Sequence, residues 1–226
     1  ACKKSSVDAP GLPLPTAGVS KIKTRAVGVN IINYTYDALG RIVAQVNSNG
    51  SKQEFEYLTG VVNKKFYNTS GVFQYGYKFE LNAEGLCIRT TMSNSPNYEL
   101  LHLFNPDKTV AKEISHINGN NSGRDYFYSN GNLDSIRFTG NNGNWQLTIS
   151  KTYYTDKPNV LSVENYGELF YGKDNKNMIK SEVYKYPDGS TTSESGYSYE
   201  YDAQGRVIKQ TSTAGNNIEI QLYTYY

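Results

Sequence analysis

Large apolar side chains alternate with polar ones along most of this chain, at a spacing of two residues. In the segment 73–81, every second residue is Phe, Tyr or Leu. A β-strand sends successive side chains to opposite faces, so this spacing predicts a strand with one apolar face and one wet face. Antiparallel sheets are built from such strands. The same spacing recurs in segments 42–46, 145–149, 197–201 and 218–222.

Turn residues interrupt these runs at short, regular intervals. Asn-Gly and Asp-Gly pairs tolerate the positive φ angles that tight hairpins need. Their spacing leaves no room for crossover helices and divides the chain into roughly 14 to 16 strands joined by hairpins. We therefore predict an all-β antiparallel meander that curls into a barrel or half-barrel. The pairs occur at 49–50, 118–119, 130–131, 142–143 and 188–189.

One stretch breaks the alternation, near residues 158–171. Asp156 suits a helix N-cap, Pro158 falls in the first turn that would follow, and Gly172 stands where such a helix would end. We predict one short helix or packed loop here. We expect it to cover an open end of the sheet.

The composition excludes several classes of protein. With 23 Lys+Arg against 21 Asp+Glu, the chain lacks the basic surplus of a nucleic-acid binder. A hydrophobic fraction of 38% is too high for a disordered chain. No run of apolar residues is long enough for a transmembrane helix. We expect a monomer with one large folded domain.

The chain begins Ala-Cys-Lys-Lys-Ser-Ser. A small residue directly before Cys2 resembles the cleavage site of a bacterial lipoprotein, in which that cysteine carries the lipid. The prolines and glycines of residues 5–20 follow no packing pattern, which is typical of a spacer. We predict a lipoprotein tether over 1–25 and a single barrel-like domain over 26–226. The alternative is a chance cysteine at an arbitrary boundary.

Lipid attachment at Cys2 would fix the location of the protein. It implies the cell envelope of a Gram-negative bacterium, with the chain anchored to the outer membrane and facing the periplasm or the cell surface. Contact with the membrane would then run through the N-terminal anchor only.

Two nine-residue segments of the chain match closely. Residues 34–42 read YTYDALGRI and residues 199–207 read YEYDAQGRV. Aromatic residues at i and i+2 share one strand face, the Asp bonds the backbone two residues on, and the Gly closes the turn with positive φ. This unit resembles the YD repeat of Rhs-type shell proteins, which are built from long β-sheets.

The whole chain is similar to a family of uncharacterised lipoproteins of gut bacteria with a porin-like fold. The similarity rests on these hairpins, on the lipoprotein-like start, and on the motifs within 154–181. It implies a curved, barrel-like antiparallel sheet. It implies no activity.

Alternation also fits an outer-membrane β-barrel, whose apolar side faces lipid. Ile218, Ile220, Leu222 and Tyr226 share one face at the end of the chain and resemble the assembly signal of such barrels. Many of the predicted strands have roughly six to eight residues, whereas a strand that spans a membrane needs about 9 to 11. We therefore favour a barrel with its tyrosines inside, where the rings fill a wide interior. The membrane barrel remains the alternative.

The sequence contains no known catalytic template. His102 and His116 have no cysteine near them in sequence, so their spacing does not predict a zinc site. Cys87 lies between Leu86 and Ile88 and is predicted to be a buried strand thiol. We expect no enzyme, no metal and no cofactor. A hydrolase with an unrecognised carboxylate pair stays open as an alternative, although Glu54 and Glu56 read as the wet face of a strand.

The remaining candidate is a ligand site at a predicted turn. Trp145 follows Asn142 and Asn144 there, and an aromatic face beside several amides suits a sugar ring. We predict a non-enzymatic module that binds a glycan or small ligand through these three residues. Two alternatives stay open: Trp145 packs inside the barrel, or the chain is a structural β-shell module that binds an envelope protein.

Overall fold

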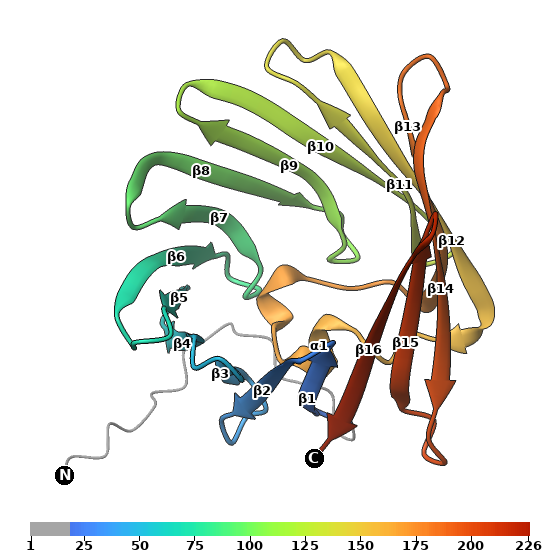
Figure 1. Ribbon diagram of the computed structural model, residues 1–226. Coiled ribbons are helices and arrows are strands. Elements are labelled where there is room, and N and C mark those ends of the chain that lie inside the picture. Colours follow the sequence, from blue (N-terminus) through green and yellow to red (C-terminus); the bar gives the residue numbers. More distant parts are fainter. Residues whose placement is uncertain (1–18) are drawn as a thin grey trace.

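The computed structural model describes residues 19–226 as a closed antiparallel barrel of sixteen strands (Figure 1). The first strand, β1 (Ile22–Val27), pairs with the last, β16 (Asn217–Tyr225), so the sheet has no open edge. The predicted all-β meander is confirmed, and of the two shapes expected the barrel is the correct one. No helix in this part of the chain has the length and apolar character needed to cross a membrane.

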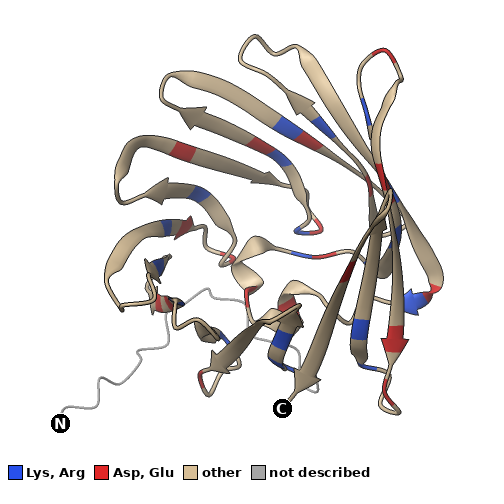
Figure 2. Ribbon diagram, viewed as in Figure 1, with Lys and Arg blue, Asp and Glu red and all other residues tan. Residues whose placement is uncertain are grey.

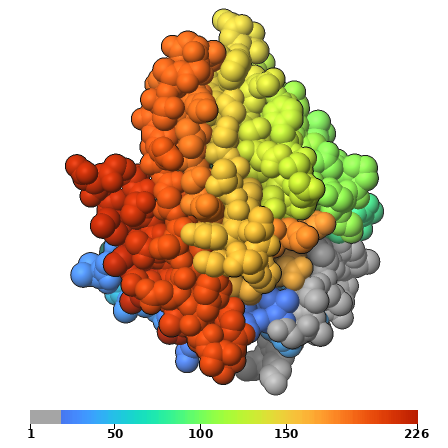
Figure 3. Space-filling view, turned by 90° about the vertical axis from the view of Figure 1, so that its right-hand side faces the viewer, coloured from blue at the N-terminus to red at the C-terminus, as the bar shows by residue number. Residues whose placement is uncertain are grey.

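Hairpins join the strands in sequence order, except for one longer connection after β12. Seen from the side, the C-terminal strands lie against one another in a continuous wall (Figure 3). The other strands are β2 (Asn30–Tyr36), β3 (Ile42–Asn47), β4 (Lys52–Leu58), β5 (Val61–Tyr67), β6 (Phe73–Leu81), β7 (Cys87–Met92), β8 (Ser95–Phe104), β9 (Val110–Ile117), β10 (Asn120–Ser129), β11 (Asn132–Thr139), β12 (Trp145–Pro158), β13 (Asn177–Lys185), β14 (Thr191–Tyr201) and β15 (Val207–Ala214).

The two matching nine-residue segments fold alike. Asp37 Oδ1 accepts hydrogen bonds from the backbone N–H groups of Leu39 and Arg41, both at 3.0 Å, and Oδ2 accepts one from Arg41 Nε at 2.7 Å. Asp202 makes the same three contacts with the turn that ends at Arg206, at 3.0, 2.9 and 2.7 Å. The predicted turn chemistry is confirmed: the carboxylate holds the turn, and Gly40 closes it with φ of 73°.

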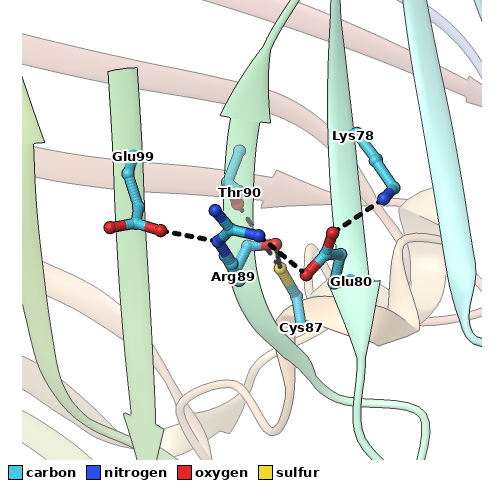
Figure 4. Close-up of polar contacts among 6 residues, drawn as sticks. All are labelled: Lys78, Glu80, Cys87, Arg89, Thr90 and Glu99. Carbon is cyan, nitrogen blue, oxygen red and sulfur yellow. Dashed lines mark hydrogen bonds and ion pairs between the residues drawn. The ribbon is translucent and has the colours of Figure 1, made fainter. Parts of the chain in front are cut away.

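The alternation places many aromatic residues inside the barrel and many charged residues outside. The outer faces of β6, β7 and β8 carry a row of ion pairs that joins Lys78, Glu80, Arg89 and Glu99, with N–O distances of 2.7, 3.3 and 2.6 Å (Figure 4). The neighbouring Thr90 points to the interior and is buried. Cys87 is buried too, as predicted. Glu54 and Glu56 lie on the outer face beside lysines, which confirms their prediction as a wet face.

A connection of eighteen residues, 159–176, runs from β12 to β13 and folds into one end of the barrel (Figure 1). We call this segment the plug. It contains α1 (Val163–Tyr166) and the 3-10 turn η1 (Leu169–Tyr171), so the predicted short helix or packed loop near 158–171 is confirmed. Phe170 is buried against Phe79, with 5.0 Å between ring centroids.

Backbone hydrogen bonds fix the plug to the turns at that end of the barrel. Gly167 O accepts from Ile42 N at 3.2 Å, Lys108 O accepts from Lys173 N at 2.9 Å, and Gly131 O accepts from Lys176 N at 2.9 Å. The plugged end therefore includes the turns 37–41, 105–109 and 130–131. Turns 118–119, 140–144 and 186–190 lie at the other end, which we call the open end.

The helix cap and the start of the first strand differ from the prediction. Asp156 does not cap the helix, because β12 continues to Pro158 and Ser162 is the N-cap. Strand β1 begins at Ile22, inside the segment 1–25 that we predicted as a tether. Cys2 lies outside the described residues, so the tether itself stays a prediction.

A substitution at Gly167 tests how closely the plug packs on the 37–41 turn. Its φ is +71°, and a Cβ there would lie 2.8 Å from Gly40 O and from Ile42 N. Gly205 has a similar φ of +76° but open space around it. Gly205→Ala should cost about 1–2 kcal/mol of unfolding free energy for the left-handed backbone. Gly167→Ala should cost roughly 1–3 kcal/mol more, because the clash displaces the plug.

Urea unfolding of both variants and the wild type measures this difference. The glycine at 205 serves as the matched control for backbone strain. Equal losses of stability in the two variants would contradict the close packing of the plug on the 37–41 turn.

Candidate functional site

The plug fills one end of the barrel interior, and cavities remain beside it on the side formed by β5 to β12. A floor cavity of about 350 Å³ extends over Tyr171 of the plug. A mouth cavity of about 370 Å³ lies nearer the open end, between β8 and β12. Tyr98, Leu100 and Glu113 line both cavities, so the two are parts of one space, which we call the lumen.

Aromatic rings form much of the lumen wall. Tyr77 on β6 and Tyr98 on β8 face each other with their ring centroids 5.8 Å apart. Phe138 on β11 lies at the mouth, beneath the Arg124 guanidinium at 5.2 Å from its ring centroid. These rings point into the barrel because each lies at one of the alternate positions that face inward on its strand. Flat apolar surfaces therefore border a space that opens to solvent.

A charged cluster interrupts this aromatic wall. Glu113 on β9 accepts contacts from two cationic side chains: His102 Nδ1 lies 3.3 Å from Oε1, and Arg124 Nη1 lies 3.1 Å from Oε2. The hydroxyl of Tyr126 also donates to Oε2. His102 Nε2 lies 3.3 Å from the hydroxyl of Thr90. The register places these groups together, because His102 pairs with Glu113 and Glu113 pairs with Arg124 across neighbouring strands.

The cluster shifts the proton affinities of its members. Burial alone would lower the pKa of His102, but the contacts with Cys87 and Glu113 outweigh it and raise the pKa to about 9. Burial would raise the pKa of Glu113, but the hydrogen bonds from His102 and Tyr126 and the charge of Arg124 hold it below its usual range. At neutral pH the cluster therefore contains a protonated imidazole and an ionised carboxylate.

The three predicted ligand residues do not share one surface. Asn142 and Asn144 line a rim hollow of about 360 Å³ at the open end, together with Ser122 and Gln146. Ser122 and Gln146 also line the mouth cavity, so this hollow leads into the lumen. Trp145 does not line it.

Trp145 opens β12 on the outer wall of the barrel. Its side chain is 42% exposed, and Arg137 stacks on it at 5.4 Å from the ring centroid. Arg137 points outward, because it alternates with the inward Phe138. Its contact with Trp145 therefore places Trp145 on the outer wall as well. The alternative expectation that Trp145 packs inside the barrel is therefore wrong.

The histidines occupy different environments. His102 is buried in the cluster, whereas His116 bonds Asn121 at 2.7 Å on an exposed part of β9. Within residues 19–226, no group of three or more His, Cys, Asp and Glu side chains is placed to hold a metal ion. Sequence reasoning missed the pairing of His102 with Glu113. His102 lies three residues before the 105–109 turn and Glu113 four residues after it, and a register shift at Leu103 and Phe104 brings them opposite each other, which the alternation alone does not signal.

The comparisons with known proteins show the fold. No protein-family model matches the chain, and no curated protein matches it either. A porin-like protein from Bacteroides uniformis shares 17% identity, with a TM-score of 0.66 over 97% of this chain and all of its own. A porin-like protein from Bacteroides vulgatus shares 10% identity, with a TM-score of 0.63 over 91% of this chain and 99% of its own.

These identities support a statement about fold alone. The predicted porin-like barrel is confirmed by both structures. The resemblance of the hairpins to YD repeats and the lipoprotein start stay predictions.

The charged cluster predicts a pH-dependent stability. The pKa of His102 is about 9 in the folded chain, against 6.5 for an unperturbed histidine. Its contribution is therefore complete below about pH 6.5 and is lost as pH rises through about 9, a loss of roughly 3 kcal/mol. Urea unfolding between pH 6 and 9.5 should show this decline. His102→Gln should remove most of the decline, and His116→Gln should retain it; a flat wild-type profile would contradict the cluster.

Proposed function

We propose that this chain is a non-enzymatic binding protein that holds a small ligand in the lumen of its barrel. The observation that carries the proposal is a continuous space that is closed at one end and open at the other. It runs from Tyr171 of the plug to Asn144 at the rim. Cavities of this size and aromatic lining are typical of sites for small molecules.

The lumen wall suits a ligand that has both flat apolar faces and hydrogen-bonding groups. Tyr98 and Phe138 offer ring faces, while Ser115, Ser122 and Thr139 offer hydroxyl groups at the mouth. Sugar rings combine the same two properties, and so do small aromatic compounds with polar substituents. This supports the predicted class of ligand, a glycan or another small molecule, and moves its contacts from Trp145 to the lumen.

The same wall favours binding over catalysis. A glycosidase needs two carboxyl groups on opposite sides of the bond that it cleaves. Glu113 is the only carboxylate among the described residues that line the floor and mouth cavities. It is engaged by His102, Arg124 and Tyr126. We therefore propose binding without a chemical step.

The outer wall supports a barrel surrounded by water. Charged positions are spread over many strands (Figure 2), and those on the outer face form ion pairs such as Lys52–Glu54, Lys112–Asp125 and Lys209–Glu200. Lys78, Arg89 and Glu99 all point outward there, and burying such charges in lipid costs several kcal/mol each. An outer-membrane barrel shares the fold, but this distribution of charge favours the anchored alternative.

The proposed location is the Gram-negative cell envelope, with lipid attachment at Cys2. The organisms of the two porin-like structures support it. Ser20 and Lys21 contact the plug, so the chain enters the barrel at the plugged end. An anchor upstream of this point would attach at the plugged end and would not obstruct the open end.

A bulky side chain in the lumen tests the proposal. Leu100 lines both cavities, whereas Leu103, three residues on, lies on the outer wall with 52% exposure. The neutral dye N-phenyl-1-naphthylamine fluoresces in apolar cavities and should bind the full chain. Leu100→Trp should weaken its binding about tenfold or more by filling the space, and Leu103→Trp should leave it unchanged.

Direct excitation of the dye avoids energy transfer from tryptophan, and a thermal melt of each variant confirms folding. No fluorescence gain with the wild-type chain would contradict the proposal, as would equal binding by the two tryptophan variants.

The rim residues can be tested with a panel of sugars. A sugar present at 100 times its dissociation constant should stabilise the fold by about 2.7 kcal/mol, which a thermal melt resolves. Asn144→Ala should reduce the stabilisation, because Asn144 lines the hollow that leads into the lumen. Trp145→Ala should retain it. The reverse pattern would assign the ligand to the outer wall beside Trp145.

A further inference from the structure

Some of the charges inside the barrel are held in pairs. Lys151 and Glu182 form a pair at 2.6 Å on β12 and β13, and both are largely shielded from solvent. Lys64 lies 3.9 Å from Glu168 of the plug. Each of these interior cations has a carboxylate of its own.

Glu113 is instead shared by two cations. One carboxylate oxygen contacts His102 and the other contacts Arg124. Because the elevated pKa of His102 keeps it protonated at neutral pH, two positive charges stand against one negative charge. The cluster therefore gives this part of the lumen wall a net positive charge.

Arg124 is the member of this cluster that a ligand can reach. It lines the mouth cavity, and its side chain is 52% exposed while that of Glu113 is 14% exposed. A guanidinium has five N–H donors, and the contacts with Glu113 and Tyr126 use only some of them. N–H donors of Arg124 therefore remain to bind a second acid group, one carried by a ligand. The Phe138 ring beneath the guanidinium supplies an apolar face beside it.

We propose that the lumen selects small ring compounds that carry an acidic group, such as a carboxylate or sulfonate, and that Arg124 binds this group at the mouth. The inference rests on the proposed function and specifies the ligand class of the same site. The ring of the ligand lies against the aromatic wall. The negative charge of its acid group neutralises the positive charge that Glu113 alone does not neutralise. Uronic acids and aromatic acids both belong to this class.

Arg137 provides a matched control for this role. It lies on the neighbouring strand and stacks on Phe127 and Trp145 at 5.3 and 5.4 Å, much as Arg124 stacks on Phe138. It faces the outer wall and borders neither cavity. Removing it changes the net charge equally without changing the lumen.

Two dyes that differ by one acid group test the proposal. The anionic dye 1-anilinonaphthalene-8-sulfonate and the neutral N-phenyl-1-naphthylamine share the same ring system. The full chain at physiological salt should bind the anionic dye about tenfold more tightly, the range for a charge-assisted hydrogen bond. Arg124→Gln should bring the two dissociation constants close together, Arg124→Lys should give an intermediate ratio, and Arg137→Gln should keep the wild-type ratio.

The outcomes separate this inference from the proposed function. Equal binding of the two dyes by the wild type would overturn the anionic preference while leaving a binding lumen. An equal fall in the ratio in Arg124→Gln and Arg137→Gln would overturn it as well, because net charge would then be the cause. Binding of neither dye would overturn both proposals.

A second arm compares sugars and does not depend on dyes. Glucuronate and glucose differ by one carboxylate, and thermal melts report their binding. Glucuronate should raise the melting temperature of the wild type more than glucose does, and Arg124→Gln should lose that difference. A larger shift with glucose would overturn the inference for sugars and dyes alike.

Discussion

Closure of the sheet is the constraint on which the rest of this structure depends. Pairing of β1 with β16 gives every strand two neighbours, and sixteen strands then enclose a wide interior. The strands' own side chains do not fill such a width. The plug supplies the missing material at one end, where Phe170 is buried against Phe79. The unfilled remainder is the lumen, so the candidate site follows from the number of strands.

Tyrosine makes this wide interior possible. Its ring covers apolar area, and in several of the described tyrosines the hydroxyl also reaches a distant backbone acceptor, which offsets the cost of burying it. Tyr36 bonds Ile22 O at 2.7 Å, Tyr154 bonds Tyr197 O at 2.8 Å and Tyr225 bonds Val207 O at 2.8 Å. The outer wall carries the opposite chemistry, with rows of ion pairs.

Local features of the sequence predicted most of the fold. The two-residue alternation and the Asn-Gly turns predicted the strands, and the loss of alternation near 158–171 predicted the plug. The helix cap was misplaced at Asp156 because β12 runs on to Pro158 and Ser162 takes the role. The His102–Glu113–Arg124 cluster was not predictable, because it depends on the register of three strands. Trp145 was chosen for its neighbours in sequence, but a register shift between β11 and β12 at this point places it on the other side of the wall from the lumen.

We propose that the binding surface is the inner wall, specifically the space beside Arg124, Tyr98 and Phe138. A crystal structure of the full chain with 1-anilinonaphthalene-8-sulfonate tests this most directly. The account predicts electron density for the dye within the lumen, with the rings on the aromatic wall and the sulfonate within hydrogen-bonding distance of Arg124. Density confined to the outer wall, beside Trp145 or along the exposed face of β16, would contradict it.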